Sequence, residues 1–599
     1  MCGIVGFITR EQVKNNDLLE AMTDEISHRG PDGRGHFFYN NVGLGHRRLS
    51  IVDLSKAGHQ PMHYLDRYTI TYNGEVYNYV ELREELEAEG YKFDSQTDTE
   101  VILAAYDRWG KDSLNKFNGM WAFAIFDKQK DELFLSRDRF GIKPLYYCQH
   151  ENDFIFASEI KSILKHPSVL AAPNRRYISD YLSGGPKEYE SETAFEGIYR
   201  FPFSSYVFIK RNNSCDTLLF SKFWELKPNT VIERFSFEKA KQYAKQYYDL
   251  LSDSVRLRLR ADVKVGSALS GGLDSSSIVY LVNQQLKSMG REELQETFSS
   301  VYKSDGTQDC DESEYIDLLA KELNVNSNQI EPNEGDIPDE VTKLLRFMEN
   351  PPDSTCMSGW YTFKKVKDKG VAVTLDGQGA DEQLSGYLPY LYVYLSSISL
   401  IDLYKELPYF FRIPGASKFL VYAFVMAHFK ALFGEIFLKW AVKKIKDIDI
   451  EVNLNRQLCN DVQTSLITLI HYSDRVSMGH SIESRMPFMD YRLVEFLANV
   501  PACYKMHNGW TKYLARLAFD KKLPDKICWR KDKMGWPIPE EHWFRGGLQE
   551  WFVEQVNMSS YFSESEKSNF LTKFHSGGNI NILIRYLNVA LLSKNFLEK

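Results

Sequence analysis

Short apolar runs alternate with amphipathic segments along the first third of the chain. Within 79–89, apolar positions recur at the spacing of one helix face. The runs with the length and composition of buried strands are 2–8, 68–72, 122–127, 133–136 and 154–157. Strands of this density with helices between them predict stacked sheets enclosed by helices, an α+β arrangement.

The rear of the chain has a different pattern. The apolar run 263–269 passes through a glycine-rich turn into a helical pattern with apolar residues at Ile278, Val279 and Val282. A second run at 371–375 ends in a similar turn. Strands that alternate with helices predict a parallel sheet, so we expect an α/β rear half.

The chain has 599 residues, more than one hydrophobic core usually holds. Turn clusters at 212–214 and 227–230 mark a connecting segment at 206–239. We therefore expect a front domain at 1–205 and a rear domain at 240–599.

Composition narrows the class of protein. Hydrophobic residues make up 43% of the chain and charged residues 26%, and the formal net charge of -8 gives no general reason to expect nucleic-acid binding. The eight cysteines have no CxxC spacing, so neither a zinc site nor a disulfide framework is indicated. No basic-then-apolar secretion signal opens the sequence. We expect a globular cytoplasmic enzyme with small-molecule substrates; a homodimer is left open.

Cys2 is the first candidate for chemistry. Removal of Met1 would leave a thiol beside a free α-amino group, whose pKa of roughly 7.7 to 8.0 lets it take the thiol proton near neutral pH. The alternative is that Cys2 is only the first residue of a buried strand.

Three polar segments beside predicted turns, at 28–33, 46–53 and 72–78, favour the first interpretation. A fourth, 97–100, opens a helical pattern, with Asp98 or Thr99 expected as the cap. One arginine and one carboxylate from such segments would together clamp a zwitterion.

These segments, in this order after an N-terminal cysteine, resemble the N-terminal-nucleophile glutaminase domain of the class II glutamine amidotransferases. The resemblance implies an αββα sandwich in which Cys2 attacks the side-chain amide of glutamine, and Asn73 and Gly74 donate to the oxyanion. Arg48 would hold the substrate carboxylate, and Glu75 and Asp98 its ammonium group. The implied glutamine-binding residues are Arg48, Leu49, Ser50, Ile51, Val52, Asn73, Gly74, Glu75 and Asp98.

The string 270–276, Ser-Gly-Gly-Leu-Asp-Ser-Ser, lies between the predicted strand at 263–269 and the helix after it. Two glycines let the backbone approach an anion, and the helix start presents unpaired N–H groups. The string lacks the lysine of a Walker A loop and resembles a pyrophosphate loop. The alternative is an ordinary Gly-Gly turn.

A second glycine-rich turn with acids spans 376–382. Adjacent parallel strands would bring the two turns together. Asp274 and Asp381 are therefore the candidates for holding Mg²⁺ on the phosphates of ATP, since hard cations prefer carboxylate oxygens. The alternative is a capped turn with solvated acids.

Together the two halves resemble the glutamine-hydrolysing asparagine synthetase family over nearly the whole chain. The segments 473–490 and 529–536 resemble its acceptor-side helix and its basic segment, which implies that Lys533, or Lys531 in its place, contacts the adenylated intermediate. The fold implied for the rear half is a doubly wound parallel sheet. The implied ATP and pyrophosphate residues are Leu269, Ser270, Gly271, Gly272, Leu273, Asp274, Ser275, Ser276, Ser300, Asp376 and Gly377, and the acceptor residues are Gln378, Asp381, Glu382 and Lys533.

Two positions depart from the family pattern. Gln378 stands where asparagine synthetases of the best-known type carry a glutamate, and this removes a candidate base for the incoming ammonia. Ser300 stands where the family more often has an aliphatic residue against adenine. Aspartate is the default acceptor. Another carboxylate, such as a sugar acid or a peptide side chain, stays open, as does a glutaminase-only or non-catalytic scaffold.

The aromatic-rich segment 388–450 is not explained by either site. Its longest apolar run, 419–427, is too short to span a bilayer, which needs about 20 residues. The expectation is a helical insertion that packs on the rear domain. A contact with a partner or a membrane surface is the alternative, because lysines are interspersed.

Overall fold

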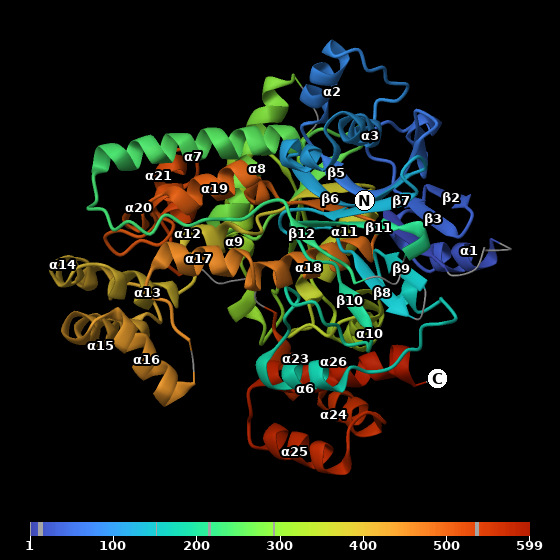
Figure 1. Cartoon of the computed structure of the whole chain (residues 1–599). Helices are drawn as coiled ribbons and strands as arrows, with labels where there is room; N and C mark the ends of the chain where they lie inside the picture. The colour runs from blue at the N-terminus through green and yellow to red at the C-terminus, as the bar shows by residue number, and fades with distance from the viewer. Residues whose placement is uncertain are drawn as a thin grey trace.

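The computed structural model describes residues 2–9, 16–150, 153–213, 217–290, 294–447, 449–532 and 538–598. Its front half contains two six-stranded antiparallel sheets (Figure 1). The first sheet has the order β10 (Ile198–Arg200), β8 (Tyr146–His150), β9 (Asp153–Ala157), β1 (Gly3–Ile8), β3 (Val42–Arg48), β2 (Gly33–Tyr39). The second has the order β12 (Ser221–Lys222), β11 (Ser205–Lys210), β7 (Glu132–Arg137), β6 (Gly119–Asp127), β5 (Tyr68–Val76), β4 (Met62–Tyr64).

The two sheets form the middle layers of a four-layer sandwich. Ile4 and Leu44 of the first sheet share a buried cluster with Ala124 and Leu135 of the second. On the outer face of the second sheet, α2 (Tyr79–Ala88) and α3 (Asp98–Trp109) contribute to another cluster, and α1 (Asp17–Asp24) packs on the first sheet. The predicted αββα sandwich is confirmed.

The rear half contains one parallel sheet. Its order is β15 (Asn326–Ile330), β14 (Glu296–Ser300), β13 (Val265–Ala268), β16 (Val373–Leu375), β17 (Glu483–Arg485). Every pairing in it is parallel, and β13 pairs with both β14 and β16. The strand order therefore reverses at β13, and the crevice outside the carboxyl ends of β13 and β16 is the topological switch point at which such sheets bind ligands. The predicted doubly wound sheet is confirmed.

Helices cover both faces of the parallel sheet. On one face lie α7 (Phe237–Arg258), α8 (Leu273–Ser288), α9 (Ser313–Leu323) and α21 (Tyr513–Phe519). On the other lie α10 (Ile337–Met348), α11 (Met357–Asp368) and α18 (Ser465–Met478). β13 and β16, at the centre of the sheet, lie in apolar runs, which is why the sequence pattern located them. β14, β15 and β17 carry mostly polar residues, and no apolar run marks them.

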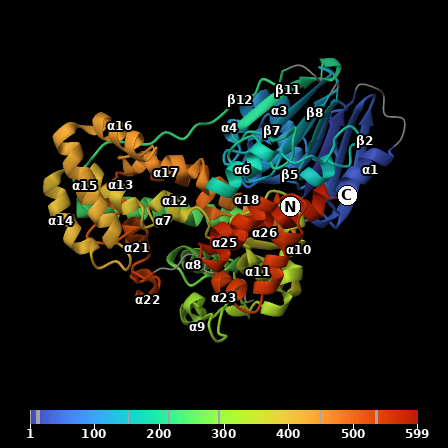
Figure 2. The ribbon, with the colours of Figure 1, turned by 90° about the horizontal axis from the view of Figure 1, so that it is seen from below.

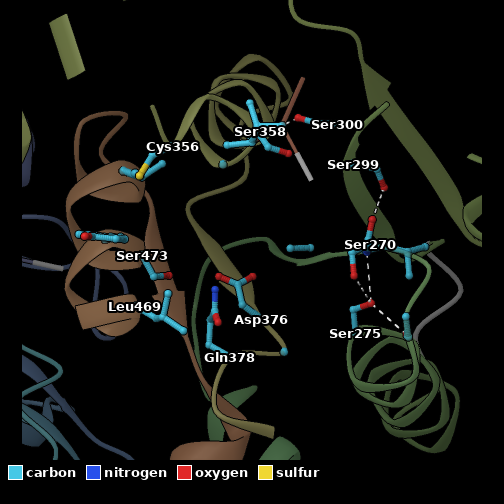
Figure 3. A pocket seen from close by; sticks show the side chains of 18 of the residues that line it. Ser270, Ser275, Ser299, Ser300, Cys356, Ser358, Asp376, Gln378, Leu469 and Ser473 are labelled. Carbon is cyan, nitrogen blue, oxygen red and sulfur yellow. Dashed lines mark hydrogen bonds between the residues drawn. The ribbon is translucent and has the colours of Figure 1, made fainter. Parts of the chain in front are cut away.

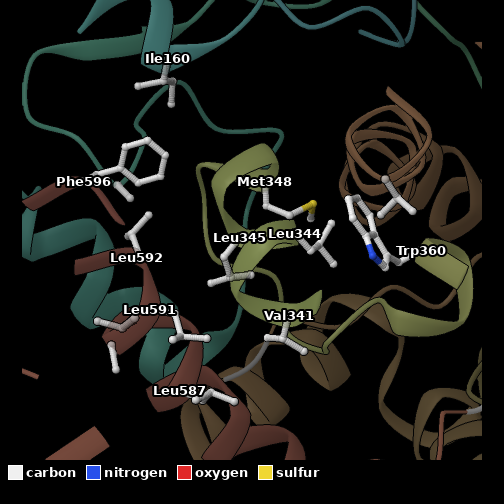
Figure 4. Packing of buried hydrophobic residues seen from close by; sticks show 14 of the residues in the cluster. Ile160, Val341, Leu344, Leu345, Met348, Trp360, Leu587, Leu591, Leu592 and Phe596 are labelled. Carbon is white, nitrogen blue, oxygen red and sulfur yellow. The ribbon is translucent and has the colours of Figure 1, made fainter. Parts of the chain in front are cut away.

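An apolar core joins the two halves. The C-terminal helix α26 (Ile580–Leu592) packs its leucines against α10, and Ile160 of α5 (Ile160–Ile163) in the front half shares the same cluster (Figure 4). Phe596 contacts Phe195 of the front half edge to face, with ring centroids 5.5 Å apart. Such a contact holds the two halves in a fixed relation.

The segment 206–239, predicted as the connection, contains most of β11, all of β12 and the first residues of α7. Its irregular part follows Lys222 and runs beside the rear half; for example, the Asn229 N–H donates to the carbonyl of Ala498 at 3.0 Å. The predicted insertion at 388–450 holds α13 (Tyr390–Ser397), α14 (Leu400–Phe410), α15 (Ser417–Phe433) and α16 (Glu435–Lys446). In Figures 1 and 2 the last three of these helices lie at an edge of the molecule, away from the sheets.

Candidate active sites

Cys2 directly precedes β1, an inner strand of the first sheet. Its backbone N–H donates to the side-chain oxygen of Asn73 at 3.1 Å, and its Sγ lies 3.9 Å from the carbonyl of Leu49. Burial raises the pKa of the thiol. A nearby base is therefore needed to generate the thiolate that attacks.

Asn73 and Gly74 are on β5, directly beside Cys2. The Asn73 carboxamide uses its oxygen for the Cys2 N–H, and its Nδ2 is buried with no hydrogen-bond partner among the described residues. A buried, unpaired N–H donor is costly unless a ligand takes it up. At Gly74 a Cβ would lie 2.1 Å from the carbonyl oxygen of Met120, so only glycine allows this close approach to β6. Asn73 therefore offers one unpaired donor beside Cys2, and close packing on β6 fixes the position of Gly74.

Arg48, the last residue of β3, lies near the same site, where its charge acts on the Cys2 thiol, and it binds the loop that follows β3. Its Nη1 donates to the carbonyl of Ser55 at 2.8 Å and its Nη2 to the carbonyl of Asp53. The loop is held to the rear half, since the Asp53 N–H donates to the Asp262 carboxylate at 2.8 Å and the Asp262 N–H donates to Ile51 at 2.9 Å. The predicted glutamine-binding residues 49–52 thus form part of the boundary between the halves.

Asp98 faces inward from the first turn of α3. Its Oδ2 accepts from the Tyr72 hydroxyl and from the Val76 N–H, each at 2.8 Å. Burial raises the pKa of Asp98 to about 6, although these two hydrogen bonds lower it. The helix cap is Thr97, whose side chain accepts from the Glu100 N–H, so the prediction of Asp98 or Thr99 as cap was wrong. Asp98 is instead available to the site.

Glu75 is the second buried acid beside Cys2. Burial and the neighbouring carboxylate of Asp98 raise its pKa. Its Oε1 lies 3.5 Å from the Arg485 guanidinium, which also binds Glu483 at 2.6 Å. Burial favours the neutral form of Glu483, but nearby positive charges, Arg485 among them, outweigh it and lower that pKa to about 2. Because β17 carries both Glu483 and Arg485, the rear half supplies part of the charge around the front site.

Arg29 is a second link between the halves. Its Nε donates to the carbonyl of Cys2 at 3.0 Å, and its Nη1 donates to Glu159 at 2.8 Å and to Asp474 at 3.0 Å. Asp474 is on α18, and its neighbour Ser473 lines the cavity of the rear half. One buried guanidinium therefore joins the backbone of the candidate nucleophile to a helix of the other site.

The predicted pyrophosphate loop connects β13 to α8. Gly271 has a φ of +75°, and a Cβ there would lie 2.8 Å from the Tyr315 side chain. The Ser275 hydroxyl accepts from the Ser270 N–H at 3.2 Å and lies 3.1 Å from the Ser270 hydroxyl. The loop is thus a tight turn with two hydroxyls on one side and the N-terminus of a helix behind it, the arrangement that binds anions.

The turn after β16 packs against this loop. A Cβ on Gly377 would lie 3.1 Å from the Ser275 nitrogen. Asp376 accepts from the Ser484 hydroxyl at 2.5 Å, and burial raises its pKa to about 6. The register of β13 on β16 therefore brings the two predicted turns together, as the sequence predicted.

A cavity of about 380 Å³ opens at this switch point (Figure 3). Figure 3 shows Gln378 and Asp376 beside the loop residues Ser270 and Ser275, with Ser358 on another side of the cavity. The lining includes these predicted residues: Leu269, Ser270, Gly272, Asp274, Ser275, Ser300, Asp376, Gly377, Gln378 and Asp381. Gly271, Leu273, Ser276 and Glu382 are next to it in sequence and are not part of its lining.

Asp274 and Asp381 converge on one cation. The Lys512 ammonium binds Asp381 at 2.6 Å and also binds Asp274. Within the described ranges, no group of three or more His, Cys, Asp or Glu side chains is gathered around a common point. Two carboxylates that share a positive charge are nonetheless a donor set that fits Mg²⁺ together with phosphate oxygens and water.

The acceptor side of the cavity holds the other predicted residues. Gln378 is half-buried and makes no hydrogen bond among the residues that the structure describes. Glu382 accepts from the Tyr387 hydroxyl at 2.7 Å, and burial, with the charge of Asp381, raises its pKa to about 7. Ser300 donates to the carbonyl of Ser358 at 2.7 Å.

Lys533 lies outside the described residues. Lys531 lies over the ring of Trp510, 4.1 Å from its centroid, and lines a separate cavity that also contains Lys512.

Sequence reasoning missed the roles of Lys512, Arg29, Glu483 and Arg485. Arg29 fell in the segment 28–33, and Glu483 and Arg485 fell in 473–490; both segments were chosen for their resemblance, but these residues were given no role. No local pattern marks Lys512.

Comparisons with known proteins agree with this two-site arrangement. A family model described as a glutamine amidotransferase domain matches residues 1–224, and one described as asparagine synthase matches residues 246–576. Asparagine synthetase [glutamine-hydrolyzing] 3 of Bacillus subtilis is 31% identical over 581 residues, covering 92% of this chain and 89% of the relative. Asparagine synthetase [glutamine-hydrolyzing] 1 of the same organism is 31% identical over 594 residues, with the same coverage.

A relative with a different name matches over a similar length. The protein called amidase chry2 of Gibberella zeae is 29% identical over 630 residues, covering 94% of this chain and 92% of the relative. Relatives that share this two-part organisation therefore carry more than one name.

Proposed function

This chain belongs to the glutamine-hydrolysing asparagine synthetase family, and from that premise we propose that it uses ammonia released at Cys2 to amidate a carboxylate in the switch-point cavity. The observation that carries the proposal is Arg29, which contacts the carbonyl of Cys2 and, through Asp474, the helix that lines the cavity. Two sites joined by a buried charged side chain suit a reaction in which one site consumes what the other releases.

In the proposed glutaminase half, the Cys2 thiol gives up its proton to a base, and the thiolate attacks the side-chain carbonyl of glutamine. The same proton passes to the leaving nitrogen, the C–N bond breaks and ammonia leaves. Water then hydrolyses the thioester to glutamate and the free thiol. The unpaired Nδ2 of Asn73 and the N–H of Gly74 would donate to the oxyanion, where one such donor contributes about 3 to 4 kcal/mol. Arg48 would bind the substrate carboxylate, with Glu75 and Asp98 on its ammonium group.

In the proposed synthetase half, an oxygen of the acceptor carboxylate attacks the α-phosphorus of ATP and pyrophosphate leaves. Ammonia then attacks the acyl carbon, AMP leaves, and a proton is lost. Ser270, Ser275 and the start of α8 would hold the pyrophosphate. Asp274 and Asp381 would hold Mg²⁺, which when bound would neutralise charge on the phosphates.

The first candidate acceptor is aspartate, the acceptor implied by the family. A different carboxylate is the second candidate, favoured by Gln378, which supplies a neutral amide where a carboxylate would serve as base, and by the similarity to amidase chry2. Both candidates share the same two half-reactions.

Mass spectrometry of the products tests the proposal. Purified protein is incubated with ATP, Mg²⁺ and glutamine, with and without aspartate, and AMP, pyrophosphate, glutamate and asparagine are quantified. Aspartate-dependent AMP with an equal amount of asparagine is the expected result. Glutamate without asparagine would overturn aspartate as the acceptor and turn the assay to sugar acids and peptide carboxylates. Absence of glutamate release would overturn the glutaminase half.

Gln378→Glu tests the acceptor assignment in the same assay. If the native chain rejects aspartate, the variant is expected to gain aspartate-dependent AMP, because the new carboxylate restores a base for ammonia. Gln549→Glu, an exposed glutamine on α24 (Gln549–Met558), is the matched control and should leave the acceptor profile unchanged. An unchanged profile in Gln378→Glu would show that position 378 does not select the acceptor.

The raised pKa of Asp98 predicts how the use of glutamine depends on pH. The ionised carboxylate is the form that binds the glutamine ammonium group, and it is lost as pH falls through about 6. We divide the kcat/KM for glutamine of the native chain by that of Asp98→Asn. Below about pH 6 this ratio should fall about tenfold for each pH unit, because the native chain loses the carboxylate and the variant has none to lose. The exposed Asp94→Asn is the control. A ratio that stays constant from pH 5 to 8 would contradict the role given to Asp98.

A further inference from the structure

Helix α15 is apolar on two opposite faces. Leu420, Ala423 and Ala427 are buried in a cluster shared with α13 and α14. The opposite face consists of side chains spaced three, four or seven residues apart: Val421, Phe424, Val425 and Leu432. All four are exposed, Leu432 by 76%. A helix that is apolar all round is normally covered on all sides, and this one is not.

The exposed surface continues onto α16. The rings of Phe429, Phe433 and Phe437 contact one another with centroids 4.8 to 5.9 Å apart, and Phe437 lies 5.4 Å from Trp440. Ile436, at the start of α16, is 87% exposed. We call the following residues the apolar face: Val421, Phe424, Val425, Leu432, Phe433, Ile436, Phe437 and Trp440. Single exposed apolar residues are ordinary, but eight of them on two successive helices are typical of an interaction site.

Positive charge accompanies the apolar face. Residues 417–446, which form α15 and α16, contain six lysines and one glutamate, a formal net charge of +5 in a chain whose net charge is -8. α15 itself contains no acid. The acids that follow α16 neutralise part of this charge: Asp449 pairs with Lys443 at 3.0 Å, and Glu451 lies 3.5 Å from Lys439. Lys418 and Lys444 make no ion pair among the described residues.

Exposed apolar side chains together with lysines favour one of the two partners that could cover the apolar face, a second copy of the chain or a lipid surface. In a symmetric pair of chains the same patch meets its own copy, which would bring two sets of lysines together. An anionic lipid surface instead attracts the lysines and accepts Phe, Leu, Ile and Trp side chains at the boundary between headgroups and acyl chains. The position of α14 to α16 at an edge of the molecule leaves room for a flat surface (Figures 1 and 2). No described helix is both long enough and apolar enough to cross a bilayer.

We propose that the apolar face docks on the surface of an anionic lipid bilayer, with α15 and α16 lying in the plane of the interface. The lysine stems extend along the apolar layer while their ammonium groups reach the headgroups. No residue of the apolar face lines the switch-point cavity or contacts Cys2, so the proposal does not depend on the identity of the acceptor.

Flotation of the full-length protein with vesicles tests the proposal. One set of vesicles contains phosphatidylcholine and phosphatidylglycerol, and the other contains phosphatidylcholine alone. We expect the protein to float with the anionic vesicles, to float at least about tenfold less with the neutral ones, and to be released by salt, because each lysine near the surface contributes about 1 kcal/mol. Absence from the floating fraction with anionic vesicles would overturn the proposal.

A variant identifies the surface responsible. Leu432→Glu combined with Ile436→Glu places two charges on exposed positions, so the fold is retained, and vesicle binding should fall at least tenfold. Leu170→Glu combined with Leu219→Glu, at positions 78% and 79% exposed in the front half, is the matched control and should bind like the native chain. Equal vesicle binding by the two double variants would overturn the assignment. Light scattering that shows native dimers, with monomers only for the face variant and no vesicle binding, would identify a second copy as the occupant.

Discussion

Cys2→Ala is expected to abolish glutamine-driven amidation while ammonium salts still drive the reaction. The substitution removes the only thiol beside Asn73 among the described residues, and with it the thioester, so glutamate release should fall about 10⁴-fold or more, as when other enzymes lose their nucleophile. The cavity at the switch point contains no atom of Cys2, so its reaction with free ammonia should stay within about twofold of the native rate.

The measurement is a paired assay of AMP and amide product, once with glutamine and once with an ammonium salt. Cys148→Ala is the matched control, because Cys148 is buried in β8 of the same half and its pKa is raised to about 11 by burial, which leaves it an inert thiol. The control should keep both activities. Survival of the glutamine-driven reaction in Cys2→Ala would refute the assignment of the nucleophile. Loss of both reactions would mean that Cys2 supports the synthetase site as well.

Local patterns in the sequence identified most of the elements that position these two sites. β1, β13 and β16 lie in short apolar runs that have glycine within or close to them, and polar residues next to these strands were chosen as candidates. Parallel pairing then determines where those ends meet, so the proximity of Gly377 to Ser275 follows from β13 and β16 being neighbours. The loop could be recognised because two glycines let the backbone approach an anion, and in the structure Gly271 has the positive φ that glycine allows.

The residues that sequence reasoning missed act across long separations. Lys512 reaches Asp274, 238 residues earlier, and Arg29 reaches Asp474, 445 residues later. Pairings of this kind depend on how the domains pack, and no local spacing encodes them. The N-cap of α3 shows that short-range patterns can also be ambiguous. Thr97, Asp98 and Thr99 can each cap a helix, and only the packing of α3 on β5 turns Asp98 inward.

Asp381→Asn is expected to stop amidation from both nitrogen sources while glutamine hydrolysis persists. Asp381 and Asp274 share the Lys512 ammonium at the mouth of the pyrophosphate loop, so the neutral amide leaves the phosphates without one of the charges that organise them. Loss of one preorganised electrostatic partner costs about 10²- to 10³-fold in rate, and AMP and pyrophosphate formation should fall by that amount. None of the described contacts of Cys2 involves Asp381, so glutamate release should remain.

Three readouts on one variant separate this role from a general loss of structure: pyrophosphate release, amide formation from ammonia, and glutamate release from glutamine. Asp368→Asn, an exposed carboxylate at the end of α11 in the same half, is the control and should keep all three. If Asp381→Asn kept pyrophosphate release, Asp381 would not act on the phosphates, and its contact with Lys512 would be structural. If glutamate release fell together with pyrophosphate release, the two sites would be coupled through the buried contacts of Arg29 and β17, because glutamine hydrolysis would then require an intact synthetase site.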